Sequence, residues 1–363
     1  MSSENVQTKW GQFISLIIVF FFWGFVGSAN DILIPVFKKV FTLSQVQSQL
    51  VAWAFYAAYF VGSIIFFLVS LKRDVLQQFG YKKTLAAGLI LSAVGSFLFV
   101  PAATMASFPF FLTALFTVGL GFSIQQIVAN PLAIKMGSPE TGAHRLTLAG
   151  GINSFGTTIG AILLGIALFG MGDNKKTNLS LEDIKLPFII LGLAFIVVAV
   201  FMYFSKIEDP AKVDEEQAII EHKHAKFNIL DYPQLYLGML GIFIYVGTEV
   251  TIISNLPALL HTNEFGNILE DAIAPFIALY WGSLMIGRWN GGVNVFNTSN
   301  LVNTALKFIV PALAFGVIIG ANIFAAHDVS TFYIYPIWIL LFIAVSFVGG
   351  KNAGKTLMLF GIS

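Results

Sequence analysis

Residues 20–35 read FFFWGFVGSANDILIP, an apolar segment that is interrupted near its end by a carboxylate. No charged side chain occurs from Phe13 to Gly27, and Asp31 follows before the hydrophobic pattern has ended. An acid inside a membrane helix costs roughly 3 kcal/mol on insertion scales, so its presence there indicates a function. Glu249 is the second acid that lies well inside an apolar segment. The sequence therefore predicts a membrane protein with a polar interior.

The composition supports this interpretation and excludes several classes of protein. Hydrophobic residues make up 57% of the 363 residues and charged residues only 11%, against about 25% in soluble domains. The net charge of +1 gives no electrostatic basis for a nucleic-acid partner. There is no cysteine, and of the five histidines only His222 and His224 lie close together, in a charged segment. We therefore expect no metal site, no cofactor and no nucleic-acid partner.

Ten segments are long and apolar enough to cross a membrane, because a spanning helix needs about 20 such residues. They lie near residues 11–37, 47–70, 83–103, 108–136, 145–171, 185–205, 233–260, 272–291, 303–325 and 332–348. The longest polar segment separates the first six from the last four. We predict an all-α integral membrane protein made of an N-terminal six-helix bundle (1–205), a central loop (206–231) and a C-terminal bundle (232–363).

The C-terminal bundle is expected to be incomplete. Residues 356–363, TLMLFGIS, read as the beginning of a further spanning helix. An arrangement of six plus six helices would need about two more helices than the sequence supplies. A fragment or a truncated gene product is the corresponding hypothesis.

The basic residues of the loops predict the orientation in the membrane. With the N-terminus in the cytoplasm, 15 of the 20 Lys and Arg residues lie on the inner side. The five on the outer side are Lys38, Lys39, Lys175, Lys176 and Lys185. The opposite topology would reverse this ratio, so we predict a cytoplasmic N-terminus and a cytoplasmic central loop.

Several motifs occur in a fixed order along the chain. LKRDVLQQFGYKKTL at 71–85 places basic residues and an acid around a glycine turn between two predicted helices. The others are NDILIP at 30–35, FTLSQVQSQLVAWAFYAAYFVGS at 41–63, Asn130-Pro131, SPETGAHRLTLAGGINSFGTTIG at 138–160 and LYWGSLMIGR at 279–288. Together they resemble the major facilitator superfamily and, within it, the fucose, galactose and glucose permease family of sugar:cation symporters.

This resemblance implies two six-helix bundles around a central sugar site that opens alternately to either side. In fucose-transporting members, an acid in the first helix and a glutamate in the fourth are linked to proton movement and sugar binding. Asp31 matches the acid, but Gln126 stands where the glutamate is expected. Gly150 stands in place of a glutamine that helps to bind fucose. The resemblance therefore favours glucose or galactose over fucose, and it puts the two-carboxylate proton pathway in question.

The polar and aromatic residues within the predicted helices are the candidates for sugar binding. Carboxylates and amides can bond sugar hydroxyls, and aromatic rings can stack on a pyranose. The predicted set is Asn30, Asp31, Gln125, Gln126, Asn153, Glu249, Tyr280 and Trp281. A structural role is also open for these residues. Asp31 could mark a helix end that faces solvent, Asn30 could cap it, and Glu249 could belong to an internal pair. The glutamines could form hydrogen bonds between helices, and the aromatic residues could lie in the core or face lipid.

Two further roles are assigned from position. Asp31 and Glu249 are the candidates for coupling to a proton or another cation. The gating or signature-loop candidates are Arg73, Asp74, Lys82, Lys83 and Arg288, the last as a cytoplasmic anchor or gate partner. The glycines of the fifth helix, Gly151, Gly156, Gly160 and Gly165, are typical of close helix packing.

These features predict a monosaccharide transporter, cation-coupled and monomeric, that crosses a bacterial inner membrane several times. Its partners would be a sugar, a proton or a sodium ion, and the lipid bilayer. The alternatives are an L-fucose:proton symporter, an inactive truncated remnant, a sugar sensor and a membrane-embedded enzyme. An enzyme would need an acid pair, a Ser/His arrangement or a metal cluster at membrane depth. A sensor would need a larger cytoplasmic domain. No such feature is evident in the sequence, so no catalytic residue is predicted.

Overall fold

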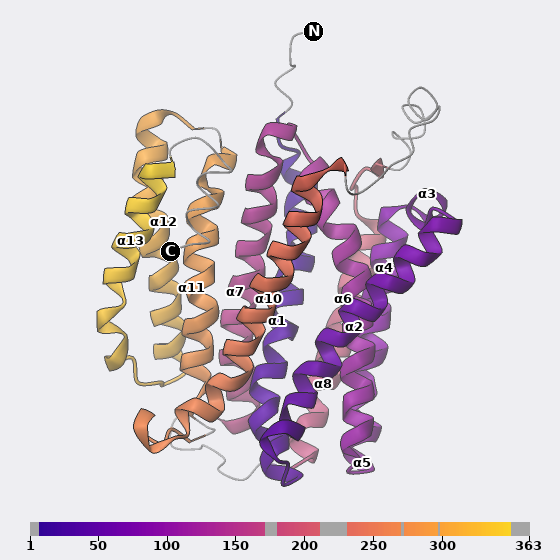
Figure 1. Cartoon of the computed structure of the whole chain (residues 1–363), viewed down its shortest axis with the longest axis vertical. Helices are drawn as coiled ribbons and strands as arrows, with labels where there is room; N and C mark the ends of the chain where they lie inside the picture. The colour runs from indigo at the N-terminus through magenta and orange to yellow at the C-terminus, as the bar shows by residue number, and fades with distance from the viewer. Residues whose placement is uncertain (1–6, 171–179, 211–230, 270–271, 297, 350–363) are drawn as a thin grey trace.

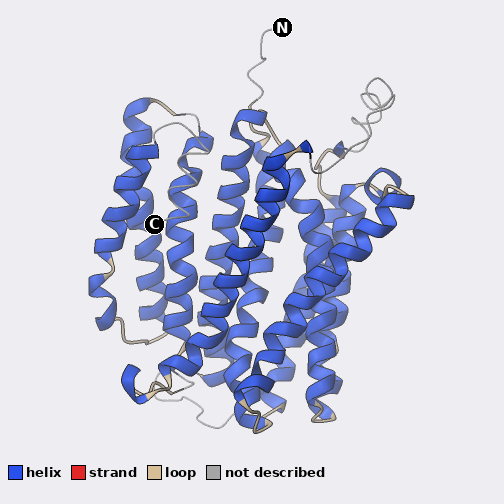
Figure 2. Cartoon of the chain, in the orientation of Figure 1, coloured by secondary structure: helices blue, strands red, loops and turns tan. Residues whose placement is uncertain are grey.

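The computed structural model describes residues 7–170, 180–210, 231–269, 272–296 and 298–349 (Figure 1). Within these ranges the chain is helical and contains no strand (Figure 2). The all-α prediction is therefore confirmed. The expected helix start at residues 356–363 lies outside the described residues, as do His222 and His224.

Each of the ten predicted segments is a helix. The helices are α1 (Trp10–Val40), α2 (Gln45–Lys72), α3 (Val75–Phe79), α4 (Tyr81–Phe97), α5 (Phe99–Thr104), α6 (Phe108–Lys135), α7 (Gly142–Phe169), α8 (Glu182–Phe204), α10 (Pro233–Leu260), α11 (Ala274–Gly292), α12 (Asn300–Phe324) and α13 (Pro336–Gly349). Short 3₁₀ turns are η1 (Pro139–Thr141), η4 (Asn263–Phe265), η6 (Val293–Phe296) and η7 (Ser330–Ile334). Helices α4 and α5 together form one of the ten.

Nine helical segments of the described chain are long and apolar enough to cross a membrane. The predicted eighth span, α11, is a helix but is not among these nine. Its sequence, APFIALYWGSLMIGRWNGG, is rich in Gly and polar side chains. Much of α11 is buried against α7 and α12, so its polar residues face protein.

Local sequence explains how the connections between helices form. Ser44 accepts a hydrogen bond from the Gln47 amide, and the Gln47 side chain accepts one from the Ser44 amide, which forms a capping box at α2. Asp74 caps α3 by accepting bonds from two backbone amides. Gly80, between α3 and α4, has φ +79°, a conformation that favours glycine.

Helix α7 lies between α1 and α11 and packs against both. A methyl group at Gly156 would meet the backbone of Phe21, and one at Gly160 the backbone of Phe25. Backbones can approach this closely only where side chains are absent. The predicted role of the α7 glycines in close packing is confirmed at these two positions.

The remaining helices lie on either side of this centre. Figure 1 shows α12 and α13 beyond α11 on one side, and α2, α4, α6 and α8 on the other. We call the end where α1 begins, at Trp10, the N-terminal end, and the end where α1 stops, at Val40, the opposite end. Helices α1, α7 and α11 lie centrally, and α10, most of which is exposed, contacts α1 and α11. The polar side chains at these contacts are the ones that can meet inside the molecule.

Candidate functional site

Asp31 lies in the centre of the helical assembly. Its side chain is 3% exposed, and its Oδ2 accepts a hydrogen bond of 2.9 Å from Nε1 of Trp281. This bond joins α1 to α11, whose residues are 250 positions apart in the sequence. A buried carboxylate with an indole donor makes a charge-assisted hydrogen bond while it is ionised, and taking up a proton removes that charge.

Glu249, on α10, belongs to a second polar cluster near Asp31. The phenol of Tyr245 donates to Glu249 Oε1 over 3.1 Å. The phenol of Tyr280 donates to the Glu249 backbone carbonyl over 2.9 Å. Tyr280 and Trp281 are neighbours on α11, so this helix contacts both acids through consecutive aromatic residues.

Arg288 extends this cluster to α7. Its guanidinium donates to Ser154 Oγ over 2.7 Å and to the Gly150 carbonyl over 3.3 Å. The same group donates to the Tyr245 hydroxyl over 3.1 Å and lies 3.7 Å from Glu249 Oε1. Arg288 lies within the predicted segment 272–291, and α11 continues to Gly292. Arg288 therefore lies inside its helix and connects α7, α10 and α11.

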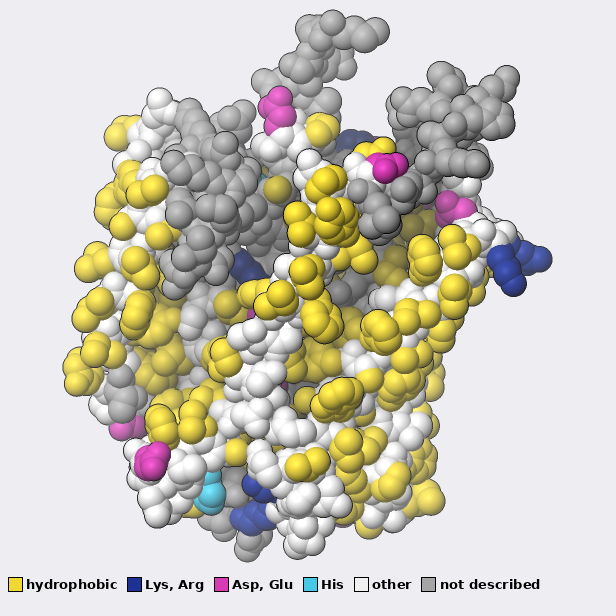
Figure 3. Space-filling view, in the orientation of Figure 1, with side chains coloured by type: hydrophobic (Ala, Val, Ile, Leu, Met, Phe, Trp, Pro, Cys, Tyr) yellow, Lys and Arg dark blue, Asp and Glu magenta, His cyan; other side chains and the backbone are white. Residues whose placement is uncertain are grey.

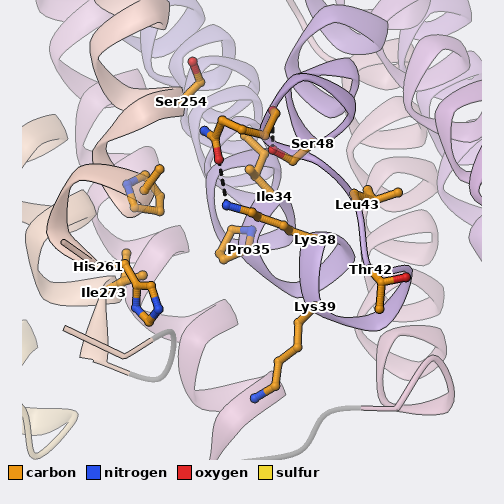
Figure 4. Close-up of a pocket in the computed structure, with 13 residues that line it drawn as sticks. Ile34, Pro35, Lys38, Lys39, Thr42, Leu43, Ser48, Ser254, His261 and Ile273 are labelled. Carbon is orange, nitrogen blue, oxygen red and sulfur yellow. Dashed lines mark hydrogen bonds between the residues drawn. The ribbon is translucent and has the colours of Figure 1, made fainter. Parts of the chain in front are cut away.

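The opposite end of the molecule contains a cavity of about 480 Å³. It lies between α1, α2, α10 and the start of α11. Figure 4 shows Ser254, His261 and Ile273 facing Pro35, Lys38 and Ser48 across it. Lys38 Nζ donates to Gln45 Oε1 over 2.7 Å at its margin. Pro35 is one helical turn from Asp31, so this cavity begins close to the buried acid.

At the N-terminal end, α7 contacts α11 and the start of α1 contacts η6. His144 Nδ1, on α7, lies 3.0 Å from the Gly291 carbonyl of α11. The rings of Trp10 and Phe296 are stacked with centroids 5.3 Å apart. These contacts join α7 to α11 and α1 to η6 at the N-terminal end, whereas the cavity of about 480 Å³ separates α1 and α2 from α10 at the opposite end.

The other predicted sugar contacts lie between helices of the first half of the chain. Gln125 is buried and donates to Ser92 Oγ of α4 over 2.9 Å. Gln126 forms a hydrogen bond with Tyr59. Asn153 Nδ2 donates to the Phe20 carbonyl of α1 over 3.1 Å. The side chain of Asn30 lies outside the described residues.

The signature-loop residues lie at the N-terminal end, around α3. Asp74 is used in the cap of α3. Lys82 Nζ donates to the Ser205 carbonyl at the end of α8 over 2.9 Å. Arg73 and Lys83 are both exposed. The sequence reasoning missed Asp209, which accepts a bond from the Tyr81 amide over 3.0 Å and so fixes the start of α4.

Sequence reasoning also missed Tyr245, Ser154, Trp23 and Tyr59. Tyr245 precedes Glu249 by four residues, a spacing that places both on one helix face and was a usable signal. Trp23 Nε1 donates to the Tyr59 hydroxyl over 2.7 Å. Nothing in a sequence with 37 Phe and 10 Tyr distinguishes these rings from packing residues. Within the described ranges, no group of three or more His, Asp or Glu is arranged to bind a metal.

Comparisons with known proteins agree with this architecture. The model of the Major Facilitator Superfamily matches residues 13–359. A glucose/galactose transporter of Brucella abortus is 36% identical over 277 residues, which cover 76% of this chain and 65% of that protein. An L-fucose-proton symporter of Haemophilus influenzae is 29% identical over 271 residues, covering 69% of this chain and 61% of that protein.

A solved structure is similar in fold. The crystal structure of the E. coli fucose:proton symporter aligns with a TM-score of 0.53 and 23% sequence identity, covering 96% of this chain and 88% of that one. This chain spans less than two thirds of the length of the Brucella relative, at 65%.

Proposed function

The chain belongs to the major facilitator superfamily, and from this premise we propose that it is a secondary transporter that carries glucose or galactose across a membrane together with a cation. The observation that carries the proposal is the buried Asp31, bonded to Trp281 and one turn from a cavity. A transporter needs such a polar point at depth, where sugar and cation can both be recognised.

The central cluster offers the chemistry that a hexose requires. Sugar hydroxyls both donate and accept hydrogen bonds, and the carboxylates of Asp31 and Glu249 accept while the phenols and Arg288 donate. The rings of Tyr280 and Trp281 lie edge to face, with centroids 5.4 Å apart. An exposed ring face in such a pair can stack on the apolar face of a pyranose. This chemistry favours a neutral polyhydroxy ligand.

Coupling to a cation rests on the two acids. Gln126 cannot exchange a proton, so the fourth spanning helix cannot carry protons through this position. We propose that Asp31 and Glu249 take up the cation instead. Sugar and cation can bias the transport equilibrium only if each binds one state better than the other. Breaking the Trp281–Asp31 bond on protonation would provide that difference, because a neutral carboxyl holds an indole donor less strongly than a carboxylate does.

We propose that the moving units are residues 1–205 and 232–363, connected by the loop at 206–231. The contacts of Arg288 with α7 and of Trp281 with α1 cross between these units. The cavity at the opposite end would then be the outer entrance, with the N-terminus in the cytoplasm of a bacterial inner membrane. The count of basic residues supports this orientation.

Uptake by purified protein in proteoliposomes tests the proposal. Labelled glucose, galactose and L-fucose are offered with an imposed proton gradient, an imposed sodium gradient or none. We expect glucose and galactose to accumulate when a gradient is present. Uptake that is independent of both gradients would rule out symport, and uptake of none of the three sugars would rule out this substrate class.

L-Fucose with a proton is the second candidate, because the Haemophilus relative is named as an L-fucose-proton symporter. Gly150 has no side chain that could bind L-fucose, and this argues against the second candidate. The space next to Gly150 is taken by Arg288, whose Cδ lies 3.6 Å from where a Cβ at Gly150 would be. Competition discriminates the two. Excess L-fucose should leave glucose uptake unchanged if the primary proposal is correct.

A further inference from the structure

A second cavity lies far from the central cluster, on the outer surface of the first half of the chain. Helices α2 and α4 both pack on α6, and the space between them is a groove of about 520 Å³. Its walls are apolar side chains of all three helices, and α3 closes one end. The lining residues of α2 and α6 include Ile65, Phe66, Val69, Leu120 and Ile124.

The closed end of this groove carries a positive charge. Lys83 is the one charged side chain among the residues that line it, and no carboxylate is included. Lys83 is exposed, and among the described residues no hydrogen bond or ion pair engages it. Asp74, the acid nearest in sequence, already accepts bonds from the Leu76 and Gln77 amides.

The surrounding surface has the same character. Figure 3 shows apolar surface over α2 that reaches charged side chains beside α3, dark-blue basic ones and a magenta acidic one. Lys72 and Arg73, at the end of α2, add two further charges next to the groove. Phe79, 54% exposed on α3, lines the groove at this end. A ligand that suits this surface combines a long apolar part with an anionic head.

The length of the groove matches one leaflet of a bilayer. Lys83 and Leu91 both line it, and eight residues of α4 correspond to about 12 Å of rise. Half of a hydrocarbon core is about 15 Å thick. With Lys83 at the level of the lipid headgroups, Leu91 therefore lies near the depth where an acyl chain ends.

We propose that this groove binds one anionic phospholipid, with an acyl chain between α2 and α4 and its phosphate at Lys83. Van der Waals contact with the three helices would hold the chain, and the ammonium group would select the headgroup. A lipid bound there would also fix α3 against the bundle. The proposal is independent of which solute the protein transports.

The absence of cysteine makes a site-specific test practical, because a single introduced thiol is unique. Val69→Cys places a bimane fluorophore at the margin of the groove, where Val69 is 46% exposed. The labelled protein is reconstituted in phosphatidylcholine vesicles containing a few per cent of doxyl-labelled phosphatidylglycerol or doxyl-labelled phosphatidylcholine. Val200→Cys, exposed on α8 near the same end, is the matched control.

We expect several-fold stronger quenching of the Val69 label by phosphatidylglycerol than by phosphatidylcholine. Lys83→Gln should reduce this preference about fivefold, the effect of one lysine near an anionic headgroup, whereas Lys83→Arg should preserve it. Ala87→Trp, which fills the groove, should reduce quenching by both lipids. The Val200 label should show no preference.

Equal quenching by the two lipids at Val69 would overturn the proposal, as would a preference that Lys83→Gln leaves unchanged. Protection of the Val69 label from both lipids, together with cross-linked dimers, would assign the groove to a second copy of the chain and overturn it as well.

Discussion

The indole of Trp281 donates to the carboxylate of Asp31 over 2.9 Å and so ties α11 to α1 in the interior of the molecule. Both side chains are at least nine-tenths buried. A hydrogen bond to a charged group contributes about 1.5–3 kcal/mol, and a buried carboxylate that loses its donor is left with the full cost of desolvation. This bond is therefore the contact at which a proton could most directly affect the packing of α1 against α11.

Trp281→Phe keeps the ring and removes the donor. We expect sugar accumulation driven by a proton gradient to fall at least about tenfold. This factor corresponds to about 1.5 kcal/mol, the lower end of the range for a hydrogen bond to a charged group. The measurement is initial uptake in proteoliposomes. Trp53→Phe is the control, because Trp53 is 70% exposed on α2. Unchanged accumulation in the Trp281 variant would show that the bond is only structural.

Asp31→Asn separates coupling from binding. An amide retains hydrogen-bonding capacity but cannot take up a proton, so we expect gradient-driven accumulation to be lost while exchange of sugar between the two sides persists. The two activities are measured in the same vesicles. Equal loss of both would indicate that Asp31 acts in sugar binding rather than in coupling.

Arg288→Lys tests the contact between α7, α10 and α11. A lysine is a point charge and cannot donate at once to Ser154 and Tyr245 as the planar guanidinium does. Loss of a bond worth about 1 kcal/mol should shift the molecule about fivefold toward opening at the N-terminal end. A single cysteine at Ser254, in the cavity of the opposite end, should then react more slowly with a maleimide, by at most about fivefold.

Ser154→Ala provides the companion measurement for this prediction. It removes the acceptor on α7 and leaves Arg288 free to pair with Glu249. Its effect on Ser254→Cys labelling should have the same direction and be smaller. Faster labelling in either variant would contradict the assignment of Arg288 to closure of the N-terminal end.

Gly24→Ala and Gly27→Ala form a matched pair on α1. A methyl group at Gly24 would meet the Asn153 backbone of α7, whereas none of the described atoms lies within 4 Å of one at Gly27. Overpacking costs about 1–3 kcal/mol, so Gly24→Ala should lower the Tm in detergent by several degrees. Gly27→Ala should leave it unchanged or raise it, because alanine favours helix. Similar Tm values for the two variants would contradict close α1–α7 packing.

Much of the fold could be predicted from the sequence, because membrane helices are recognised by their length and apolar composition. All ten expected segments are helices, and the family resemblance carried by NDILIP and LYWGSLMIGR is confirmed by the superfamily match. Helix ends were less predictable. The first predicted segment ended at residue 37, whereas α1 continues through Lys38 and Lys39 to Val40.

The candidate site was predictable only in part, for a physical reason. An acid in an apolar helix is costly and conspicuous, so Asp31 and Glu249 could be found without a structure. Trp281 was predicted as a sugar contact, but its bond to Asp31 appears only when the fold brings α11 against α1. Tyr245 was missed, although its spacing from Glu249 was a usable signal. Asn153 illustrates the converse, because a polar side chain within a membrane helix can bond a neighbouring helix, as its Nδ2 bonds the Phe20 carbonyl. Gln125 does so with Nε2 alone, and its buried Oε1 has no partner among the described residues.

Glu208 gives a prediction for pH dependence outside the membrane-spanning helices. Hydrogen bonds from Lys9 and Gln12, followed by the charge of Lys9, hold the pKa of Glu208 below its usual value. A carboxyl whose pKa is lowered on folding stabilises the native state above its unfolded pKa, roughly 4.3 for Glu. That stabilisation is lost as the pH falls through the folded pKa. The contact should therefore be present at neutral pH and absent in acid.

Thermal melts of the wild type and Glu208→Gln between pH 7 and pH 3 measure this contact. We expect a small Tm difference at neutral pH that begins to fall near the unfolded pKa of roughly 4.3 and is lost as the pH passes through the lower folded pKa. The difference should also shrink in high salt because the pair is exposed. Glu264→Gln, on an exposed turn at the other end of the molecule, is the control variant. A Tm difference that is constant across this range would mean that the Glu208 charge does not attach the start of α1 to the segment following α8.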